Sequence, residues 1–277
     1  MNIFHSPFQP LLLGILQGLT EFIPVSSTAH LLIAEHILKI PPADPALFAF
    51  NVLIELGTTI ALIVFFWKDL WIIIKAVVLG LVKGRPFENQ NAKLGWLIAL
   101  ATIPALLAGF LLKNTVEKLF TNPLIESSIR LLITAILLGL VEWLGKPNRK
   151  LESINWVDAL FFGIAQVLAV FPGASRSGST MSGGMARGFD RPSAARFAFL
   201  MSAPVMLAAG GYESLDLFKM SNLGSFLPFL VVGFIIAAFV GWLSIKWLLG
   251  YLNHHSFFIF AAYCALLGTA CLAFALA

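Results

Sequence analysis

Two short polar stretches in an otherwise apolar chain carry the residue types that could do chemistry. The first runs from Gln17 to His30 with the sequence QGLTEFIPVSSTAH, and the second runs from Phe171 to Thr180 with the sequence FPGASRSGST. Each groups hydroxyls, glycines and ionisable side chains around a proline. Such groups are costly in hydrocarbon unless they face a polar cavity. The chemistry of the protein is therefore expected at these two stretches.

The stretch around Arg176 is typical of a site that binds an oxyanion. Gly173, Ser175, Ser177 and Gly178 permit a tight turn of backbone N–H groups at the start of a helix. Arg176 adds a planar cation with bidentate donors. The alternative is a turn that only reverses a helical hairpin. Burying an unpaired guanidinium at membrane depth for a turn alone costs about 3 kcal/mol or more, which favours the anion site.

The stretch that ends at His30 supplies groups that a phosphate site otherwise lacks. Ser27 stands at the start of a helix as a candidate nucleophile, and His30 follows three residues later as a candidate acid or base. Glu21 is an anion able to orient a proton or to hold a cation. Taken singly, Ser26 and Ser27 could be only helix caps, and His30 could be an interior histidine with satisfied hydrogen bonds. Their joint occurrence predicts a reaction centre.

The elements that position these stretches are expected to be membrane helices. Of 277 residues, 59% are hydrophobic and 12% are charged, and the mean hydropathy is +0.90, so polar surface is too scarce to coat a soluble globule. The apolar segments recur along the whole chain, which predicts one polytopic membrane domain over 1–277, without a removable signal peptide. The net charge of +4 is scattered between these segments. This pattern fits loops that face anionic lipid and gives no indication of nucleic-acid binding.

The first half of the chain, about 1–150, predicts a re-entrant hairpin followed by three spans. In order, it predicts two short helices, a span, an amphipathic helix and two further spans, at about 10–22, 26–38, 46–67, 71–82, 94–112 and 127–144. The two short helices are separated by Pro24, and each is too short to cross about 30 Å of hydrocarbon. Glu55 lies in the first span, where it could line the same cavity or pair with a polar group inside the bundle.

The second half, about 151–277, predicts the same order of elements. Its hairpin and three spans are expected at about 156–171, 177–187, 193–211, 226–249 and 256–276. Direct matches at an offset of 149 residues include Gln17 with Gln166 and Gly14 with Gly163. Chance similarity is high in apolar sequence, so the repeat depends mainly on the shared order of elements.

Three spans per half is an odd number, so the second half would enter the membrane from the opposite side. The fold class predicted is thus an all-α membrane protein with two inverted repeats. The basic residues agree with one orientation, because the following would share a side: Lys68, Lys75, Lys83, Arg85, Lys93, Lys146, Arg149, Lys150, Arg187 and Arg191. That side is expected to be cytoplasmic, with both termini outside. The two polar tips would then meet near the midplane, in a site that opens to the outer side.

The two polar stretches together resemble the signature motifs of the bacterial undecaprenyl-diphosphatase family, also called the bacitracin resistance protein family. The resemblance covers essentially the whole chain, including its length and the order of its apolar segments. It implies a phosphatase of the bacterial plasma (inner) membrane that converts undecaprenyl diphosphate into the monophosphate and inorganic phosphate. This reaction recycles the carrier lipid of peptidoglycan synthesis, and the family is associated with bacitracin resistance.

The resemblance also implies which residues form the active site and that Mg²⁺ or Ca²⁺ assists. By similarity, Glu21, Ser27 and His30 are expected to be catalytic, and Ser175, Arg176 and Thr180 are expected to bind phosphate. The residue types of the two stretches add Ser26, Thr28, Gly173 and Ser177 as expected phosphate-binding residues. The metal ligands expected are Glu21 and Gln17. Position 17 carries either Glu or Gln in the family, so one carboxylate that could bind the metal is absent here. Ala29 replaces a glycine that often precedes the histidine.

Several alternatives stay open from the sequence. The attacking group could be Ser27 or an activated water, and either Glu21 or His30 could accept its proton. The partners expected are a polyprenyl diphosphate and the bilayer, with a homodimer left open. The alternative function is a lipid-phosphate transporter or flippase, alone or combined with the phosphatase. Inverted repeats whose broken helices meet at the midplane are a transporter architecture.

Overall fold

The computed structural model describes residues 4, 6, 8–42, 44–116, 122–145, 147–170, 174–217 and 223–276. These residues form eleven α-helices and one short 3-10 helix, with no β-strand element among them: α1 (Phe8–Thr20), α2 (Ser27–Ile37), α3 (Pro45–Phe65), α4 (Trp67–Val82), α5 (Gln90–Val116), α6 (Pro123–Leu144), η1 (Leu151–Ser153), α7 (Trp156–Val167), α8 (Arg176–Ala186), α9 (Arg191–Leu217), α10 (Leu223–Leu252) and α11 (Phe258–Leu276). The predicted all-α class is confirmed.

Six of these helices are long and apolar enough to cross a membrane, namely α3, α5, α6, α9, α10 and α11. The short helices α1 and α7 are also apolar, and each precedes a second short helix, α2 or α8. The protein is therefore an all-α, multi-pass integral membrane protein. The order of a helical pair followed by three spans occurs twice, as the sequence predicts, while the symmetry of the two halves stays a prediction.

Local sequence explains where each hairpin breaks. The helix α1 ends at Thr20, four residues before Pro24, and the side chain of Ser26 caps α2 by accepting from the Ala29 amide at 3.5 Å. In the second hairpin, Ser175 caps α8 by accepting from the Gly178 amide at 3.2 Å. Such caps satisfy backbone donors that a helix start leaves free. Each polar stretch therefore lies at a capped helix start inside the bundle.

Glycines let the first helix of each hairpin approach the backbone of a spanning helix. A Cβ atom on Gly14 of α1 would lie 2.8 Å from the carbonyl oxygen of Gly233 in α10. A Cβ atom on Gly163 of α7 would lie 2.4 Å from the carbonyl oxygen of Ala101 in α5. Both contacts require a residue without a side chain. Gly14 and Gly163 therefore have the same role: each allows a short helix to pack closely against the backbone of a long helix.

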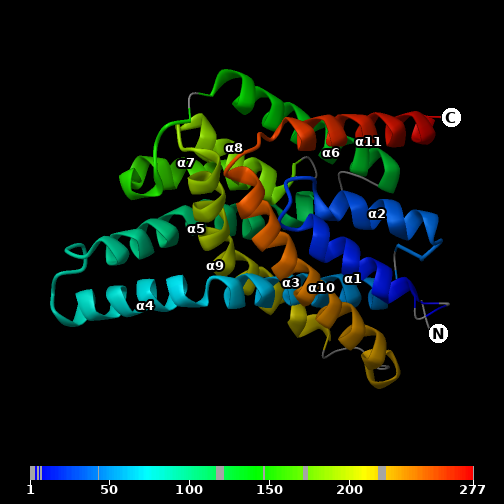
Figure 1. The fold of residues 1–277 in the computed structure, drawn as a ribbon. Coiled ribbons are helices and arrows are strands. Elements are labelled where there is room, and N and C mark those ends of the chain that lie inside the picture. Colours follow the sequence, from blue (N-terminus) through cyan, green and yellow to red (C-terminus); the bar gives the residue numbers. More distant parts are fainter. Residues whose placement is uncertain are drawn as a thin grey trace.

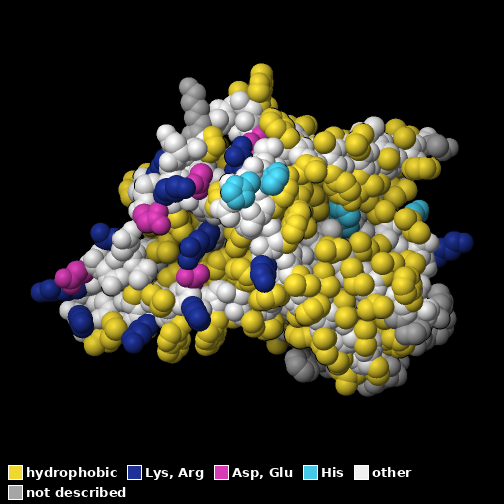
Figure 2. All heavy atoms as spheres, in the orientation of Figure 1, with side chains coloured by type: hydrophobic (Ala, Val, Ile, Leu, Met, Phe, Trp, Pro, Cys, Tyr) yellow, Lys and Arg dark blue, Asp and Glu magenta, His cyan; other side chains and the backbone are white. Residues whose placement is uncertain are grey.

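Basic side chains gather at one end of the molecule (Figure 2). Arg196 of α9 pairs with Asp69 of α4 at 2.9 Å, which places basic segments of both halves together. Asp158 at the start of α7 accepts from Arg149 at 2.6 Å and from Arg187 at 2.8 Å. Burial raises the pKa of Asp158, but the hydrogen bonds from both arginines outweigh burial and hold the pKa below its usual value. The start of α1 and the end of α11 lie at the opposite end (Figure 1).

The surface helix between the first two spans is longer than the sequence predicts. It was expected near 71–82, but α4 begins at Trp67, separated from α3 only by Phe66. No glycine or proline separates the two helices, so nothing in the local sequence turns the chain at this point. The helix α4 and the start of α5 project from the bundle at its basic end (Figure 1).

Candidate active site

The tips of the two hairpins meet inside the bundle. The guanidinium of Arg176, at the start of α8, forms an ion pair with the carboxylate of Glu21, which follows α1. The hydroxyl of Ser177 donates to the backbone carbonyl of Ile23 at 3.4 Å. The structure thus brings together the two polar stretches that the sequence singled out.

Glu21 is the centre of the hydrogen bonds at this meeting point. Its Oε2 accepts from the hydroxyl of Ser27 at 2.6 Å and from the amide Nε2 of Gln17 at 3.0 Å, while its Oε1 faces Arg176. The Glu21 side chain is 5% exposed. A serine hydroxyl that donates to a buried carboxylate is oriented for transfer of its proton to that carboxylate.

Glu55 of α3 is the second carboxylate of the site. Its Oε1 accepts from Nη2 of Arg176 at 2.8 Å, so one guanidinium lies between two glutamates. The sequence left open whether Glu55 lines the cavity or pairs within the bundle, and the structure shows both. With Arg176, Glu21 and Glu55 ionised, the cluster carries a net charge of about −1.

His30 faces away from Ser27. Its Nδ1 lies 2.8 Å from the backbone carbonyl of Ser26, and its Nε2 lies 2.7 Å from the hydroxyl of Tyr263 in α11. Since a carbonyl oxygen only accepts, Nδ1 carries the proton, and in a neutral ring Nε2 accepts from Tyr263. Ser26 has a left-handed backbone with φ of 68°, which is unusual for a non-glycine residue. His30 therefore supports the carbonyl of the strained residue that precedes Ser27.

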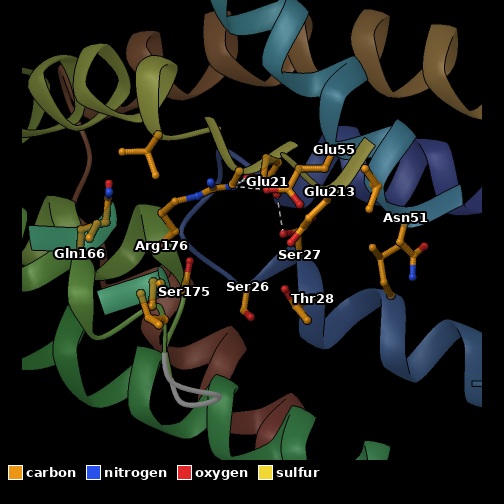
Figure 3. Close-up of a pocket in the computed structure, with 18 of the residues that line it drawn as sticks. Glu21, Ser26, Ser27, Thr28, Asn51, Glu55, Gln166, Ser175, Arg176 and Glu213 are labelled. Carbon is orange, nitrogen blue, oxygen red and sulfur yellow. Dashed lines mark hydrogen bonds and ion pairs between the residues drawn. The ribbon is translucent and has the colours of Figure 1, made fainter. Parts of the chain in front are cut away.

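Three of the other predicted phosphate-binding residues line the cavity beside Glu21. Ser26 and Ser175 do so as helix caps, so their hydroxyls are already engaged by backbone amides. Ser175 also contacts Ser177 at 3.1 Å between the hydroxyl oxygens. Thr28 is exposed and faces the cavity (Figure 3).

Two further predicted residues do not line this cavity in the structure. Thr180 is fully buried, and its hydroxyl donates to the backbone carbonyls of Arg176 at 2.8 Å and Ser177 at 3.2 Å. The Ser177 hydroxyl joins the two tips. Both side chains hold the start of α8 in place beneath Arg176. Gly173 lies outside the described residues.

The cavity has a volume of about 810 Å³ and changes character along its length. Its polar part contains Glu21, Ser27 and Arg176 (Figure 3). The apolar part of the lining comes mainly from α5 and α9, with Ala105, Leu106, Phe110, Val205, Ala208 and Ala209, while Tyr212 and Glu213 of α9 also line the cavity. A cavity of this kind fits a ligand with a charged head and a hydrocarbon tail.

Six polar side chains that the sequence interpretation did not assign also line the cavity: Gln166, Asn51, Glu35, Arg130, Tyr212 and Glu213. Asn51 donates to Glu35 at 2.9 Å, and Arg130 pairs with Glu126 at 2.8 Å. Two signals could have found part of this set. Asn51 lies four residues before Glu55 on the same helix face, and Gln166 corresponds to Gln17 in the repeat.

A divalent cation could be held here only together with substrate oxygens. Among the residues that the structure describes, no group of three or more His, Cys, Asp or Glu side chains gathers as a metal site. Magnesium usually binds one or two carboxylates plus substrate phosphates rather than an all-protein cage. Glu21 and Glu55 fit that pattern, and Gln17 retains a carbonyl oxygen because its Nε2 is the atom that donates to Glu21. The donor set is therefore compatible with the expected Mg²⁺ or Ca²⁺.

The site combines a serine, a carboxylate and an arginine in an amphiphilic cavity, inside a bundle of six long apolar helices. These are the parts of an enzyme embedded in the membrane. The comparisons with known proteins agree with this class. The family model of the bacitracin resistance protein BacA matches residues 10–270, so the chain belongs to the BacA family. The family membership predicted from the two motifs is confirmed.

The curated relatives carry the name undecaprenyl-diphosphatase. The protein of Chlorobium phaeovibrioides is 41% identical over 272 residues, which cover 94% of both chains. The protein of Anaeromyxobacter dehalogenans is 42% identical over 257 residues, which cover 91% of this chain and 86% of the relative. The protein of Chloroherpeton thalassium is 39% identical over 273 residues, covering 96% and 95% of the two chains.

Proposed function

We propose that this protein is an undecaprenyl-diphosphatase, which removes the terminal phosphate of the lipid diphosphate and leaves the monophosphate. The observation that carries the proposal is the 2.6 Å hydrogen bond from the Ser27 hydroxyl to Glu21, beside Arg176, in a cavity with an apolar wall. Nucleophile, base and phosphate-binding cation are then present in one place. The names of the relatives support the choice of lipid.

The first chemical step is phosphoryl transfer to Ser27. Its Oγ forms a bond to the terminal phosphorus, its proton passes to Glu21, and the bond from that phosphorus to the bridging oxygen breaks. The prenyl monophosphate leaves with the electrons of that bond. Water then attacks the phosphoserine, releasing inorganic phosphate and restoring the serine. Glu21 is the proposed base because both ring nitrogens of His30 are engaged by other groups, Ser26 and Tyr263.

Arg176 is proposed to exchange its partners when the substrate enters. In the structure its Nη2 contacts both Glu21 and Glu55. A diphosphate offers the planar guanidinium several oxygens in bidentate geometry, and such charge-assisted pairs are roughly twice as strong as neutral hydrogen bonds. The backbone N–H groups at the start of α8 add further donors and a favourable helix dipole.

Mg²⁺ or Ca²⁺ is proposed to be held by Glu21 and Glu55, with Gln17 beside them. The cluster has a net negative charge before a diphosphate arrives, and the diphosphate adds more in surroundings of low dielectric constant. When bound, a divalent cation would neutralise charge on the phosphate oxygens. The protein's own residues supply the nucleophile, the base and the fixed positive charge.

The apolar wall of α5 and α9 is proposed to take the prenyl chain. Leu106 and Phe110 of α5 and Val205 of α9 line the cavity, and the first two are more than a third exposed. In the membrane these side chains would border the hydrocarbon, so the lipid tail could enter without leaving it. The cavity thus receives the headgroup while the tail stays in an apolar environment.

The location follows the distribution of basic residues. We place the protein in the bacterial inner membrane with its basic end in the cytoplasm and the cavity open to the outer side, where it would recycle carrier lipid for peptidoglycan synthesis and confer bacitracin resistance. A cysteine introduced at Asn89 or Asn148, both in the basic segments, should react with an impermeant thiol reagent only from the cytoplasm. Reaction from outside would reverse the assigned orientation.

The assay that tests the activity is phosphate release from a prenyl diphosphate by purified protein in detergent. Wild type should release one phosphate per lipid, and Ser27→Ala should not. Ser182→Ala is a matched control, because Ser182 is buried in α8 but does not line the cavity. Lipid movement across vesicles without phosphate release would instead support the transporter or flippase. The Ser27–Glu21 contact favours catalysis, because transport alone needs no nucleophile.

A further inference from the structure

One side chain that lines the cavity has no hydrogen-bonding partner. Gln166 lies in the last turn of α7 and is 2% exposed. Neither its Oε1 nor its Nε2 has a partner in the described part of the chain. A buried amide without a partner costs about 1–3 kcal/mol. A buried amide that lacks a partner and borders a cavity indicates that a ligand binds there.

The corresponding glutamine of the first hairpin shows what the second one lacks. Gln17 donates its amide to Glu21, which lies four residues further along the chain. The residue four positions after Gln166 is Val170, which also lines the cavity and offers no side-chain acceptor. The two glutamines match at the offset of 149 residues, but only the first has an acceptor within the described part of its own hairpin. Among the described residues nothing accepts from the Gln166 amide, so a bound molecule can supply the acceptor.

The surroundings of Gln166 define the chemistry of that molecule. Gln166, Ser175 and Arg176 lie on one side of the pocket, and Ser27 and Thr28 lie on the other (Figure 3). Ser175 and Arg176 stand at the start of α8, where an anionic oxygen is well placed.

Apolar lining begins directly beside the Gln166 amide. Ala169 and Val170 follow it in the chain, and Ala105 and Leu106 line the cavity from α5, which packs against α7. A group bound at Gln166 therefore has an anionic oxygen and is joined to a hydrocarbon chain.

We infer that the Gln166 amide binds the lipid-linked phosphate of the diphosphate, which is the phosphate that leaves with the prenyl chain. The identity of this ligand is taken from the proposed function, so the inference rests on that function. In-line attack by Ser27 requires the bridging oxygen to lie on the far side of the terminal phosphorus from Ser27. Gln166 lies across the pocket from Ser27 (Figure 3).

The order of the ligand in the cavity follows from this assignment. The terminal phosphate lies at Ser27 and Glu21, the lipid-linked phosphate lies at Gln166 and Ser175, and the tail continues along α5. As the phosphorus–oxygen bond breaks, negative charge develops on the lipid-linked phosphate, and the two N–H groups of the amide stabilise it without transferring a proton.

The test measures binding of the two reaction products separately to purified protein in detergent, by calorimetry. Farnesyl monophosphate is the probe for the lipid-linked phosphate, and inorganic phosphate is the probe for the terminal one. Gln166→Met keeps the approximate length of the side chain and removes both donors. It should raise the Kd of farnesyl monophosphate about tenfold or more, because hydrogen bonds to charged groups are of that strength, and change the Kd of inorganic phosphate less than about twofold.

Ser182→Ala is the matched control for this experiment. The Ser182 hydroxyl is also buried without a partner in the described residues, but it does not line the cavity. Both dissociation constants should stay at their wild-type values. The ligand-free Tm of Gln166→Met should equal or exceed that of wild type, since an unpartnered amide is removed.

Three outcomes would overturn the assignment. They are an unchanged Kd for farnesyl monophosphate, a larger effect on inorganic phosphate than on the lipid, and a ligand-free Tm below that of wild type. Binding of the products does not depend on turnover, so the experiment distinguishes a failure of the Gln166 assignment from a failure of the proposed phosphatase activity. A wild-type protein that binds farnesyl monophosphate through Gln166 but releases no phosphate from farnesyl diphosphate would contradict the phosphatase and leave the Gln166 site standing.

Discussion

The two hairpins have the same architecture and opposite chemistry. Each is a short apolar helix followed by a capped helix start, with Ser26 capping α2 and Ser175 capping α8. The first tip carries Glu21 and Ser27, an acid and a hydroxyl, whereas the second carries Arg176. The comparison teaches that two similar hairpins can divide one site between them, with the hydroxyl and the carboxylate on one tip and the arginine on the other.

The largest effect is expected where the first tip loses its attacking oxygen. Ser27→Ala should lower kcat by about 10³-fold or more, because no neighbouring group can replace a covalent nucleophile without moving. Steady-state phosphate release measures the effect, and an unchanged elution profile in detergent controls for folding. Activity within a few-fold of wild type would transfer the attack to water or to Ser26.

The next effect is expected where the second tip loses its planar cation. Arg176→Lys should lower kcat/KM at least about tenfold, or about 1.4 kcal/mol, because an ammonium cannot reproduce the fork of donors on phosphate oxygens. The same substitution keeps the positive charge between Glu21 and Glu55. Near-normal kinetics would mean that charge alone matters at this position, and the division of roles between the tips would be weaker than described.

A smaller effect is expected at the second carboxylate of the site. Glu55→Gln should raise the Mg²⁺ concentration needed for half-maximal activity by about tenfold, since one of the two proposed carboxylate ligands is lost. Gln17→Glu combined with Glu55→Gln should recover part of that loss, because position 17 already lies within 3.0 Å of Glu21. A titration of activity with Mg²⁺ measures both variants. No change in the cation requirement of either variant would remove Glu55 from the proposed site.

The smallest effect is expected at the hydrogen bond behind the first tip. Tyr263→Phe removes the partner of His30 Nε2 and should lower the free energy of unfolding by about 1 kcal/mol. The dependence of kcat on pH should keep its shape, because in the proposed mechanism His30 supports the Ser26 carbonyl and Glu21 takes the Ser27 proton. A pH profile whose limbs shift in this variant would instead return His30 to the role of base.

The sequence predicted the features that depend on local chemistry. The hairpin breaks follow from Pro24 and from the capping serines, the spans follow from apolar length, and the two motifs identified the family. The meeting of the two tips was also predicted, from the expectation that an odd number of spans per half would bring the hairpins in from opposite faces. These inferences use only residue type, spacing and hydrophobicity.

The rest depends on contacts between residues far apart in the chain. His30 is three residues from Ser27, yet its ring faces Tyr263, and no local spacing indicates that partner. The position of Glu55 between cavity and bundle was undecided because Arg176 reaches it from the other hairpin. The sequence distinguishes Gln166 only by its match to Gln17 in the expected repeat. That its amide lacks an acceptor among the described residues depends on the three-dimensional contacts.

The arginine held between two glutamates also has a consequence for which lipids could bind. Any anion that enters the cavity competes with two carboxylates already seated on Arg176. The phosphodiester headgroup of an ordinary bilayer lipid brings a single negative charge and gains little by displacing them. A diphosphate brings more charge and more oxygens, so it can displace both and also attract a divalent counter-ion. Under the proposed function, this competition would favour a lipid diphosphate over the monoanionic phospholipids of the bilayer.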